Sequence, residues 1–456
     1  MDNPALQQIV ATFSSLPIQQ QNNFLKEILK LCQPLQLRIV YAELQPLLAV
    51  DFARYLSNDL AERIFSWLDV QSLCRASQCS RSWRDRADAD HLWRRHCRRR
   101  GWLRFGSISS SVTRWKDVYV RALRLEANWA RGRYVVEPIL RGHKKRIGCI
   151  DCDGRILVSG SADNTARIWD LEGHKCIRVL DSHSDEVTCI ALRNGILVTG
   201  CSDGLIRLWN AESGKRLGQF TGDPGGAGIC SMAFDGQTLI CGTADRGRLQ
   251  VWSAVEGRHL DTLMGHADEV KCIQLAGSVA ISGSWDRTLR VWDLKKGISK
   301  HILKRHTEGI FCCQADEEKA VSGGGDGLVV LWDLQKGDAL HAMMGHEAEV
   351  YCLEYNADVI ATGSADSTAR LWDHNGFCLH VLEEHIGIVR CLQLFESRLV
   401  TGGDQKKLVV WDTQNGDLVN VVHRHSTLLH LLWTDATRIV TASPDSPGTI
   451  TVLNYW

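Results

Sequence analysis

Histidine, serine or threonine, and aspartate side chains recur together through the last two-thirds of the chain. These are the residue types of a hydrolase triad, in which a histidine activates a hydroxyl group and a carboxylate orients the histidine. The group recurs five times at one spacing, each time followed by a tryptophan, as His143/Ser159/Asp163/Trp169, His183/Thr199/Asp203/Trp209, His266/Ser282/Asp286/Trp292, His306/Ser322/Asp326/Trp332 and His346/Thr362/Asp366/Trp372. Because five copies at one spacing do not suit a single catalytic site, we interpret these residues as structural.

Other patterns that could support chemistry are weak or missing from the sequence. Cys149 and Cys152 form a CxxC pair, but residues three apart on a strand point to opposite faces, which argues against a shared metal ion. Many of the 17 cysteines stand in a repeated Val/Ile-x-Cys pattern, typical of small buried hydrophobes in a reducing compartment. The sequence has no glycine-rich phosphate loop, GxSxG elbow or HExxH zinc pair, so we expect neither an enzyme nor a cofactor.

Tryptophans set a regular period over the same region. They stand at Trp169, Trp209, Trp252, Trp292, Trp332, Trp372 and Trp411, with gaps of 40, 43, 40, 40, 40 and 39 residues. Each repeat opens with a Gly-His-like pair, and each tryptophan follows a hydrophobic strand and a tight turn, as in residues 159–170. From about Arg141 to Trp456 this pattern resembles the WD40 repeat, which implies four strands per repeat, arranged as the blades of a β-propeller.

The resemblance also implies a role for the recurring polar residues. In WD40 repeats the histidine, the serine or threonine, the aspartate and the tryptophan form one hydrogen-bonded chain, which satisfies buried polar groups. Three repeats depart from this set: Asp223 replaces the histidine of the third, Asp404 falls one place early in the seventh, and Leu453 replaces the tryptophan of the eighth. We expect these three blades to be less well stabilised by hydrogen bonds of this kind.

Eight Gly-His-like starts predict eight blades, with residues 134–456 as the propeller. Each start is followed by three strands, and the chain stops at Trp456, just after the third strand of the eighth repeat. Residues 134–140, ahead of the first Gly-His pair, are able to supply the missing fourth strand. Closing the ring in this way would remove the open edges of the sheets.

Composition and charge limit the other classes of protein. The sequence has no long apolar run and no basic and apolar leader of the secretory type, so we expect the protein in the cytoplasm or the nucleus. Residues 1–133 hold 21 Lys and Arg against 12 Asp and Glu, and the net charge of the chain is zero, so the propeller is negative. A negative propeller argues against nucleic-acid binding there. The basic excess peaks at Arg94–Arg100, which is either a solvated helix face or a nuclear-localisation or nucleic-acid patch.

Residues 51–97 predict a short helical module ahead of the propeller. Leu60, Ile64 and Leu68 keep helical spacing, and Ser57 or Asn58 is placed to cap that helix. Further helices are expected from about Gln71 and beyond Trp83. A module of this size is marginal in isolation, which suggests that it docks on a partner.

The same residues resemble the F-box. The resemblance is carried by Asp51, Phe52, Leu56, Leu60, Ala61, Ile64, Leu68, Asp69, Leu73, Cys79, Ser80, Arg81, Trp83, Asp90, Leu92 and Trp93, with Ser57 where the family usually has a proline. It implies that the module binds a Skp-family adaptor, and the residues that we assign to this contact are Leu56, Leu60, Ile64, Leu68, Trp83, Leu92 and Trp93. The alternative is a helical cap on the propeller.

The flanking segments extend the resemblance over nearly the whole chain. Residues 1–50 contain an amphipathic stretch, 24–32, followed by further apolar residues, and they resemble the dimerisation segment that precedes the F-box in several F-box/WD-repeat proteins. Residues 98–133 resemble that family's linker helices. The predicted fold is therefore α plus all-β: a helical segment, an F-box and linker helices, followed by an eight-bladed WD-repeat β-propeller.

This family resemblance implies a substrate receptor of an SCF-type ubiquitin ligase. In that scheme the F-box binds the Skp-family adaptor, which links to a cullin and a RING subunit, while the propeller binds the target protein. The chain itself would contribute proximity and no bond chemistry. Two alternatives stay open: a WD-repeat scaffold without ubiquitin ligase activity, and a nucleic-acid binder that uses the basic N-terminal part.

The family often binds targets on the narrow propeller face around the central channel. The residues before the first-strand cysteine lie there in register, and they are Gly148, Thr188, Lys271, Phe311, Tyr351 and Arg390, with His430 in the eighth repeat. Trp285 and Arg287 flank a turn aspartate on the same face. We predict a mixed aromatic and basic pocket of Lys271, Trp285, Arg287, Phe311, Tyr351 and Arg390 rather than a pure phosphate clamp. The alternative is that some of these are ordinary rim residues, and whether the target must be phosphorylated is left open.

Overall fold

The structure, a computed structural model, describes residues 4–48, 51, 55–105, 114–222, 226–244, 247–404, 407–422, 430–443 and 447–456. It divides into two compact units, Met1–Ala122 and Leu123–Trp456. The division falls within helix α10 (Trp115–Arg131), so each part of this helix is described with its own unit. None of the described helices is long and apolar enough to cross a membrane.

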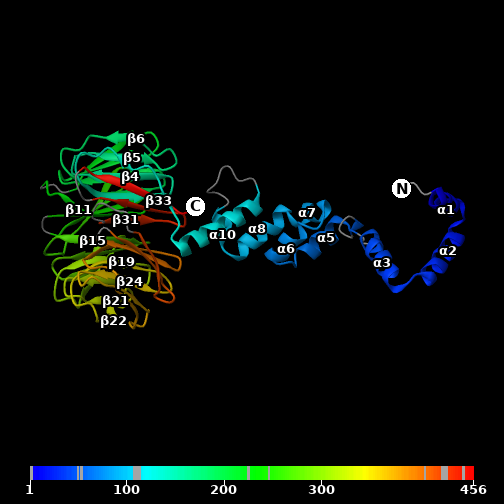
Figure 1. The fold of residues 1–456 in the computed structure, drawn as a ribbon. Helices are drawn as coiled ribbons and strands as arrows, with labels where there is room; N and C mark the ends of the chain where they lie inside the picture. Colours follow the sequence, from blue (N-terminus) through cyan, green and yellow to red (C-terminus); the bar gives the residue numbers. More distant parts are fainter. Residues whose placement is uncertain are drawn as a thin grey trace. The chain divides into compact units, whose positions relative to one another are not determined.

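The first unit is built from helices (Figure 1). They are α1 (Pro4–Ser15), α2 (Ile18–Leu31), α3 (Pro34–Leu48), α5 (Asn58–Phe65), α6 (Val70–Ala76), α7 (Arg81–Ala87), α8 (Asp90–Arg99), the 3-10 turn η1 (Trp102–Arg104) and the first part of α10. Asp69 caps α6 by accepting a hydrogen bond from the backbone of Ser72 at 2.8 Å. The sequence placed the next helix beyond Trp83, but it begins at Arg81 because Ser80 caps it.

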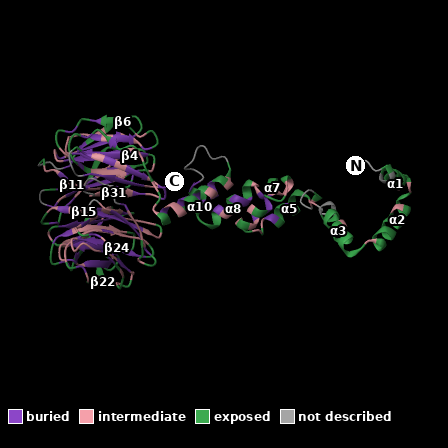
Figure 2. Ribbon diagram, viewed as in Figure 1, coloured by how far each residue is buried: buried purple, intermediate pink, exposed green. Residues whose placement is uncertain are grey.

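A small apolar core holds the helices α5 to α8. Phe65 and Leu73 are buried, and Trp93 is 1% exposed. Trp93 Nε1 donates to the carbonyl oxygen of Ala87 at 2.8 Å, and its ring centroid lies 5.5 Å from that of Tyr119 on α10. By contrast, α2 has no buried residue, and Figure 2 shows α1 to α3 mostly in the colour of exposed residues.

The second unit is an eight-sheet propeller, as the sequence predicted (Figure 1). The first four sheets contain β3 (Ile147–Cys152), β4 (Ile156–Ser161), β5 (Ala166–Asp170) and β6 (Lys175–Leu180); β7 (Val187–Arg193), β8 (Ile196–Cys201), β9 (Leu205–Asn210) and β10 (Arg216–Thr221); β11 (Ile229–Phe234), β12 (Thr238–Thr243), β13 (Leu249–Ser253) and β14 (Arg258–Leu263); and β15 (Val270–Ala276), β16 (Val279–Ser284), β17 (Thr288–Asp293) and β18 (Ile298–Lys304). Neighbouring strands are antiparallel and follow chain order, so each sheet is one blade.

The other four sheets complete the ring. They contain β19 (Ile310–Ala315), β20 (Lys319–Gly324), β21 (Val329–Asp333) and β22 (Asp338–Met343); β23 (Val350–Tyr355), β24 (Ile360–Ser364), β25 (Ala369–Trp372) and β26 (Cys378–Leu382); β27 (Val389–Phe395), β28 (Arg398–Gly403), β29 (Leu408–Asp412) and β30 (Leu418–Val422); and β31 (Leu431–Thr434), β32 (Arg438–Ala442) and β33 (Thr449–Asn454) with β1 (Val135–Val136) and β2 (Leu140–Arg141). The eighth blade thus combines both ends of the propeller sequence.

Two short strands close this eighth blade. Val135 and Val136 in β1 pair with Asn454 and Leu453 in β33. Between β1 and β2, the backbone of Glu137 donates to the carbonyl oxygen of Val452 at 3.0 Å. The strand that precedes the first repeat therefore covers the outer edge of the last one, and the backbone groups of β33 are paired on both sides.

Side-chain to backbone hydrogen bonds join neighbouring blades around the centre of the ring. Asp151 accepts from the backbone of Leu192 at 2.7 Å, and Gln314 does the same from Tyr355 at 2.6 Å. Gln393 repeats the pattern with the backbone of Thr434 at 2.6 Å. Each bond satisfies a buried amide of the next blade, so it fixes the stagger between adjacent first strands.

The second part of α10 belongs to the propeller unit. Trp129 Nε1 donates to the carbonyl oxygen of Ala436 at 2.8 Å, and the Trp129 ring stacks on Tyr455 with centroids 3.8 Å apart. The guanidinium of Arg398 lies 5.2 Å from the Trp129 ring. This end of the helix is therefore fastened to the last two blades.

Candidate protein-interaction sites

The recurring polar residues form hydrogen-bonded chains inside the blades. In the first blade, Trp169 Nε1 lies 2.8 Å from Ser159 Oγ, and Ser159 Oγ lies 2.8 Å from His143 Nε2. An indole N–H can only donate, so the serine oxygen accepts from it and donates its own hydrogen to the histidine. His143 Nδ1 then donates to a carboxylate oxygen of Asp163, 3.0 Å away.

The same chain is present in the fourth, fifth and sixth blades. Their histidine to hydroxyl distances are 2.7, 2.8 and 2.8 Å, and their histidine to carboxylate distances are 2.8, 3.0 and 2.8 Å. The hydroxyl-bearing residues Ser159, Ser282, Ser322 and Thr362 are fully buried. A buried hydroxyl that already donates and accepts is not available to attack a substrate, so these groups hold the blades together.

Burial also sets the protonation of the chain in the first blade. It lowers the pKa of His143 below the ordinary value for histidine, so the ring is neutral. Burial acts to raise the pKa of Asp163, but hydrogen bonds from Thr165, the Lys144 backbone and His143 outweigh it and lower that pKa to about 2. A neutral histidine between a hydroxyl and a carboxylate fits the hydrogen-bond directions described above.

The second blade departs from the direct chain that its sequence predicts. His183 Nδ1 faces the guanidinium of Arg207 at 2.7 Å, and Arg207 in turn pairs with Asp203 at 2.9 Å. Because a guanidinium can only donate, His183 accepts at Nδ1 and carries its hydrogen at Nε2, the reverse of His143. Cys201 lies beside His183 and Asp203 in a grouping with metal-ligand chemistry. The Arg207 charge within this grouping opposes a cation there.

One residue in the sequence explains where Arg207 goes. In the first, fourth and sixth blades a glycine precedes the histidine, and a Cβ atom added at Gly142 would lie 2.6 Å from Arg167. The arginine of those blades packs in the space that glycine leaves open. The second blade has Ser182 at this position, so it carries the Cβ atom that would collide with an arginine placed in that way. Arg207 turns inward instead and becomes buried, with 3% of its surface exposed.

The three departing repeats are each different. In the third blade, Asp223 lies outside the described residues, the buried Trp252 N–H has no hydrogen-bond partner within the described part of the chain, and Trp252 stacks on Phe220 at 4.7 Å. In the seventh, His385 and Trp411 both bond Thr401, at 2.9 and 3.0 Å. In the eighth, Leu453 is buried where a tryptophan would stand. His425 and Asp445 of that blade also lie outside the described residues.

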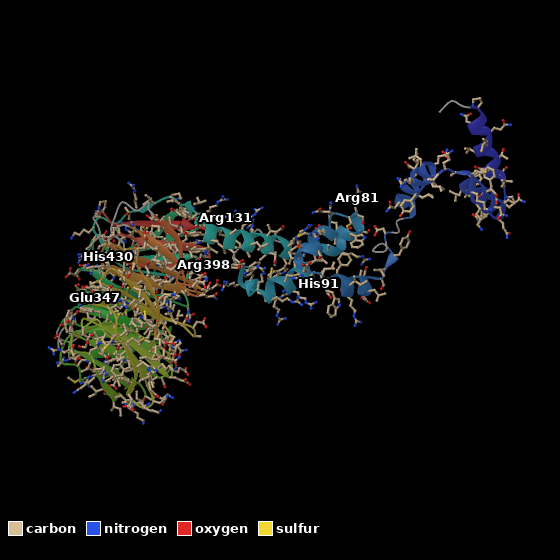
Figure 3. The ribbon with its side chains drawn as sticks, turned by 60° about the horizontal axis from the view of Figure 1, so that its bottom comes forward. Arg81, His91, Arg131, Glu347, Arg398 and His430 are labelled. Atoms are coloured by element: carbon tan, nitrogen blue, oxygen red, sulfur yellow. The ribbon has the colours of Figure 1, made fainter. Side chains whose placement is uncertain are left out.

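A β-bulge places one residue near the start of the first strand in each of the first seven blades. The register shifts in the first seven blades around Gly148, Thr188, Cys230, Lys271, Phe311, Tyr351 and Arg390. A bulge inserts an unpaired residue and redirects its side chain, so these positions form a ring of one residue per blade. Figure 3 shows His430 and Glu347 toward one side of the propeller, away from Arg398 and Arg131.

Three aromatic side chains of this region form a continuous surface, which we call the aromatic ledge: Trp285, Phe311 and Tyr351. The Trp285 and Phe311 rings meet edge to face at 5.1 Å, and the Phe311 and Tyr351 rings stack at 5.2 Å. Trp285 is 41% exposed. The backbone makes room for the rings, since a Cβ atom at Gly309 would lie 2.6 Å from the Trp285 ring.

The predicted cations lie at the two ends of the ledge, and both are already paired. Lys271 Nζ lies 5.9 Å from the Trp285 ring and forms an ion pair with Glu269 at 2.8 Å. Arg390 lies 4.9 Å from the Tyr351 ring and pairs with Asp404 at 3.1 Å. Burial acts to lower the pKa of Arg390, but the Asp404 hydrogen bond and charge outweigh it and raise that pKa.

The structure therefore brings together five of the six residues predicted for the target pocket. Arg287 is exposed in the turn beside Trp285, with a backbone φ of 68°, and its side chain is not part of the contacts that join the other five. Sequence reasoning missed the acidic partners Glu269 and Asp404. The misplaced Asp404 was a signal, because its early position moves it out of the blade-locking chain and leaves it free to pair with Arg390 and His430.

The predicted adaptor-binding residues fall into three groups by exposure. Leu60 and Ile64 are exposed on α5, at 54% and 45%. Leu56, Leu68 and Trp83 are half-buried. Leu92 and Trp93, by contrast, are 2% and 1% exposed, so the prediction that they contact the adaptor is corrected: they pack in the core that supports the surface.

Two exposed aromatic residues were missed. Trp67 is 84% exposed and Tyr55 is 76% exposed. Trp67 continues the spacing of Leu60 and Ile64, while Ala61 and Phe65 on the other side of α5 are buried. The helix is therefore apolar both toward its own core and toward solvent, which is typical of a surface that binds a partner.

Asp51 organises the start of α7. Its carboxylate accepts hydrogen bonds from Ser80 Oγ at 2.7 Å, from Ser82 Oγ and from Trp83 Nε1 at 2.8 Å. These contacts join the segment that precedes α5 to the third helix of the module. The hydrogen bond to Asp51 thus fixes the orientation of the Trp83 ring, whose centroid lies 5.5 Å from that of the Phe65 ring.

The basic run Arg94–Arg100 lies on α8 and just after it. Arg94 lies 5.6 Å from the Trp115 ring, and Arg100 lies 4.8 Å from the Trp102 ring. Cys97, between these two arginines in the sequence, is fully buried. Two of the arginines are therefore used for packing within the unit, which favours the solvated helix face over a nucleic-acid patch.

Comparison with known families agrees with this division. The F-box-like family model matches residues 58–99. The family model described as "WD domain, G-beta repeat" matches residues 135–170, 174–210, 257–293, 297–333, 337–373 and 376–412. The crystal structure of the computationally designed Ika8 protein superposes with a TM-score of 0.65 and 28% sequence identity, over 69% of this chain and 98% of that one.

Curated relatives are named as an SCF subunit, an F-box/WD-repeat protein and an F-box protein. The chain is 32% identical over 212 residues to "Probable E3 ubiquitin ligase complex SCF subunit sconB" of Arthroderma otae, which covers 39% of this chain and 31% of the relative. It is 33% identical to "F-box/WD repeat-containing protein 7" of Drosophila melanogaster, over 39% of this chain and 14% of the relative, and 29% identical to an F-box protein of Saccharomyces cerevisiae, over 38% and 34%. The matches thus span about a third or less of these relatives. With an F-box-like helical module followed by WD40 repeats, the chain belongs to the F-box/WD-repeat proteins.

Proposed function

We propose that this protein is the substrate-recognition subunit of an SCF-type cullin–RING ubiquitin ligase. The observation that carries the proposal is an exposed apolar face, formed by Leu60 and Ile64 on α5 and by Trp67 in the turn that follows it, while the other side of α5 packs in the F-box-like core. A Skp-family adaptor would cover this side and link the chain to the cullin and RING subunits. The names of the relatives support the same role.

In this scheme the propeller binds the target, and the chain itself catalyses no chemical step. The blade histidines are buried in structural hydrogen bonds, which leaves the loops as the surface for recognition. The aromatic ledge, with Lys271 and Arg390 at its ends, is the part of that surface best suited to anchor a peptide. The ligase would gain rate because the target is held near the ubiquitin-charged enzyme.

The helices α1 to α3 are proposed as a dimerisation segment. Their apolar side chains are exposed along all three helices, and Ile18, Leu31 and Leu35 are 76%, 84% and 70% exposed. A cavity of about 600 Å³ is lined mainly by apolar residues of α2 and α3, such as Leu29 and Tyr41. A second copy of the segment would bury these side chains. We propose that the ligase acts in the cytoplasm or the nucleus.

The proposal is tested by affinity purification of the tagged full chain from cells. We expect the Skp-family adaptor and a cullin in the purified sample. A Leu60→Ala/Trp67→Ala variant should lose both, because it removes the centre of the apolar face. The matched control is Leu103→Ala, which changes another exposed leucine of the same unit, 37% exposed, and should keep both partners.

The alternative is a WD-repeat scaffold without ligase activity. It predicts that propeller-binding proteins co-purify while the adaptor and the cullin do not. If the unaltered chain brings down neither the adaptor nor the cullin, the ligase proposal is wrong and the scaffold is favoured. If the double variant keeps both, the assignment of the α5 face is wrong.

A further inference from the structure

The aromatic ledge lies among acidic loops. The three residues between the histidine and the first strand are Ala-Asp-Glu in the fourth blade, Thr-Glu-Gly in the fifth and Glu-Ala-Glu in the sixth. These loops contain five acidic residues, Asp268, Glu269, Glu308, Glu347 and Glu349, and no basic residue. The potential above the rings is therefore set by carboxylates.

The cations beside the rings do not offset this charge. Lys271 is neutralised by Glu269 at 2.8 Å, and Arg390 by Asp404 at 3.1 Å. A phosphate group that approached the ledge would have to displace one of these carboxylates, and the acidic loops would repel it. Arg287 beside Trp285 is exposed, but it is one positive charge against the four acidic residues of the loops that remain once Glu269 is paired with Lys271.

Glu308 is the acidic residue nearest the middle of the ledge. A Cβ atom added at Gly325 would lie 2.9 Å from Glu308 Oε2 and 3.2 Å from the Phe311 ring, so the carboxylate and the ring adjoin the same glycine. Glu308 is exposed, and within the described ranges its carboxylate has neither a hydrogen bond nor an ion pair. The carboxylate is therefore available to a ligand that also touches the rings.

The ends of the ledge show how such a ligand would bind. Lys271 and Arg390 each lie near an outer ring, at 5.9 and 4.9 Å from its centroid, and each also pairs with a carboxylate. Each end thus combines a cation with an aromatic ring and an acid. Phe311 and Glu308, in the middle, offer a ring and an acid without the cation.

We propose that the ledge binds a lysine or arginine side chain of the target, inserted beside Trp285 and Phe311 and paired with Glu308. The inference rests on the proposed function, because it names the feature that the receptor recognises in its target. It assigns the site to a basic and apolar peptide segment rather than to a phosphorylated one. The paired Lys271 and Arg390 then keep the rings in place instead of gripping the ligand.

The test measures peptide capture by the immobilised full chain. The probes are short synthetic peptide libraries of one length with one fixed central residue, which is arginine, lysine, citrulline or phosphoserine, and a mixture of Ala, Gly, Leu and Ser elsewhere. We expect the arginine and lysine libraries to be retained about tenfold more than the citrulline library, because citrulline keeps the shape of arginine without its charge. Their retention should fall as the salt concentration rises.

Variants locate the site. Glu308→Gln keeps the shape of the side chain and should remove most of the preference for arginine over citrulline, while Trp285→Ala should reduce capture of all basic libraries. The matched controls are Glu212→Gln and Leu217→Ala, on exposed residues of the second blade, and they should change neither. Thermal unfolding of each variant shows that the propeller is intact.

Several results would overturn the inference. Preferential retention of phosphoserine, equal retention of arginine and citrulline, retention of no library, or an unchanged preference in Glu308→Gln would each contradict it. The adaptor is measured in the same preparations, and its site is on the helical module. Loss of the adaptor with intact peptide capture would therefore reject the ligase proposal alone, and the reverse result would reject the ledge assignment alone.

Discussion

The helical module and the propeller place their polar and apolar side chains in opposite ways. On α5 and in the turn after it, the module exposes Leu60 and Trp67 at 54% and 84%, although both are apolar. The propeller buries polar groups instead, with Ser159 and Ser282 fully inaccessible. The module thus leaves apolar surface for another chain to cover, whereas the propeller satisfies these buried hydroxyl groups within its blades.

The difference indicates how each unit contributes to function. The propeller is complete in itself, because β1 covers its last edge and hydrogen-bonded chains lock its blades. Recognition there is left to side chains that the core does not need, such as those of the aromatic ledge. In the module, by contrast, one short helix carries both the exposed Leu60 and Ile64 and the buried Ala61 and Phe65, so the exposed face and the core belong to the same element. Substitutions should therefore separate folding from binding more cleanly on the propeller loops than on α5.

Removing the closing strands tests whether the propeller is self-contained. Deletion of residues 134–141 takes β1 and β2 away and exposes the edge of β33, together with the pocket that holds the buried Leu140. We expect a loss of about 5 kcal/mol or more and a fall in Tm of at least about 10 °C, measured by thermal unfolding. Val136→Ala, which keeps the backbone pairing, is the control and should cost less than about 1 kcal/mol. An unchanged Tm after the deletion would show that the ring does not depend on this strand.

Substitutions at the buried Trp93 and the exposed Trp67 distinguish residues that stabilise the module from residues proposed to bind the adaptor. Trp93→Ala removes a 1% exposed ring and its hydrogen bond to Ala87, so we expect a loss of about 3–5 kcal/mol and unfolding of this module. Trp67→Ala changes an 84% exposed ring and should leave the free energy of unfolding within about 0.5 kcal/mol, while adaptor binding falls. Near-UV circular dichroism and adaptor capture measure the two effects. A Trp67→Ala module that unfolds would contradict the division.

Much of the fold could be predicted from the sequence, because the propeller repeats its signal. The eight blades followed from the period of tryptophans and Gly-His-like pairs, and the structure confirms them. The second blade was not predicted correctly in detail. Ser182 replaces a glycine there, and its Cβ atom would collide with an arginine placed as in the first, fourth and sixth blades, while Arg207 faces His183 instead. Such a choice depends on neighbours across the blade, which a spacing pattern does not contain.

The sites were harder to predict than the fold for the same reason. The register of the first strands correctly brought Phe311 and Tyr351 together, because one bulge recurs in each blade. The ion pair that neutralises Lys271 depends on side-chain conformations, and no motif marks it, whereas the pair of Arg390 was signalled only by the early position of Asp404. For the F-box-like module, a motif match does not tell which residues face inward. Leu92 and Trp93 match the motif because they form its core.

Breaking the hydrogen bonds inside one blade should destabilise the propeller less than deleting its closing strands. Ser282→Ala leaves the N–H of Trp292 and Nε2 of His266 buried without a partner, so we expect a loss of about 2–3 kcal/mol in the free energy of unfolding. Ser282→Thr keeps the hydroxyl and should cost less than about 1 kcal/mol, since the sixth blade has Thr362 at this position. Denaturant unfolding compares them. Equal losses would mean that packing, and not the hydrogen bonds, is what matters there.

Acidification should weaken the propeller through its buried histidines. Burial, together with the charge of Arg207, lowers the pKa of His183 to about 4, and burial with the charge of Lys407 does the same for His385. The unfolded chain, with histidine pKa values near 6.5, therefore binds protons at a pH where the folded chain does not. This stabilisation is fully present above about pH 6.5 and is lost as the pH falls toward 4. By about pH 5, each of these histidines has cost the folded state about 2 kcal/mol in the free energy of unfolding. Denaturant unfolding between pH 7 and pH 5 should show the slope, and His183→Gln should flatten it by one histidine's share; an unchanged slope would exclude His183.

The smallest expected effect is a gain, at the residue where the module departs from its family. Ser57 has φ of −59°, which suits proline, and its side chain makes no capping hydrogen bond to α5. Ser57→Pro should therefore stabilise the module by about 0.4–1 kcal/mol, because proline restricts the unfolded chain without straining the folded one. Ser57→Ala removes the hydroxyl without restricting the backbone, so it should not reproduce the gain. If proline destabilises the module instead, the segment before α5 requires the backbone freedom of serine. The position of the exposed apolar face of α5 then depends on Ser57 as well as on the core beneath the helix.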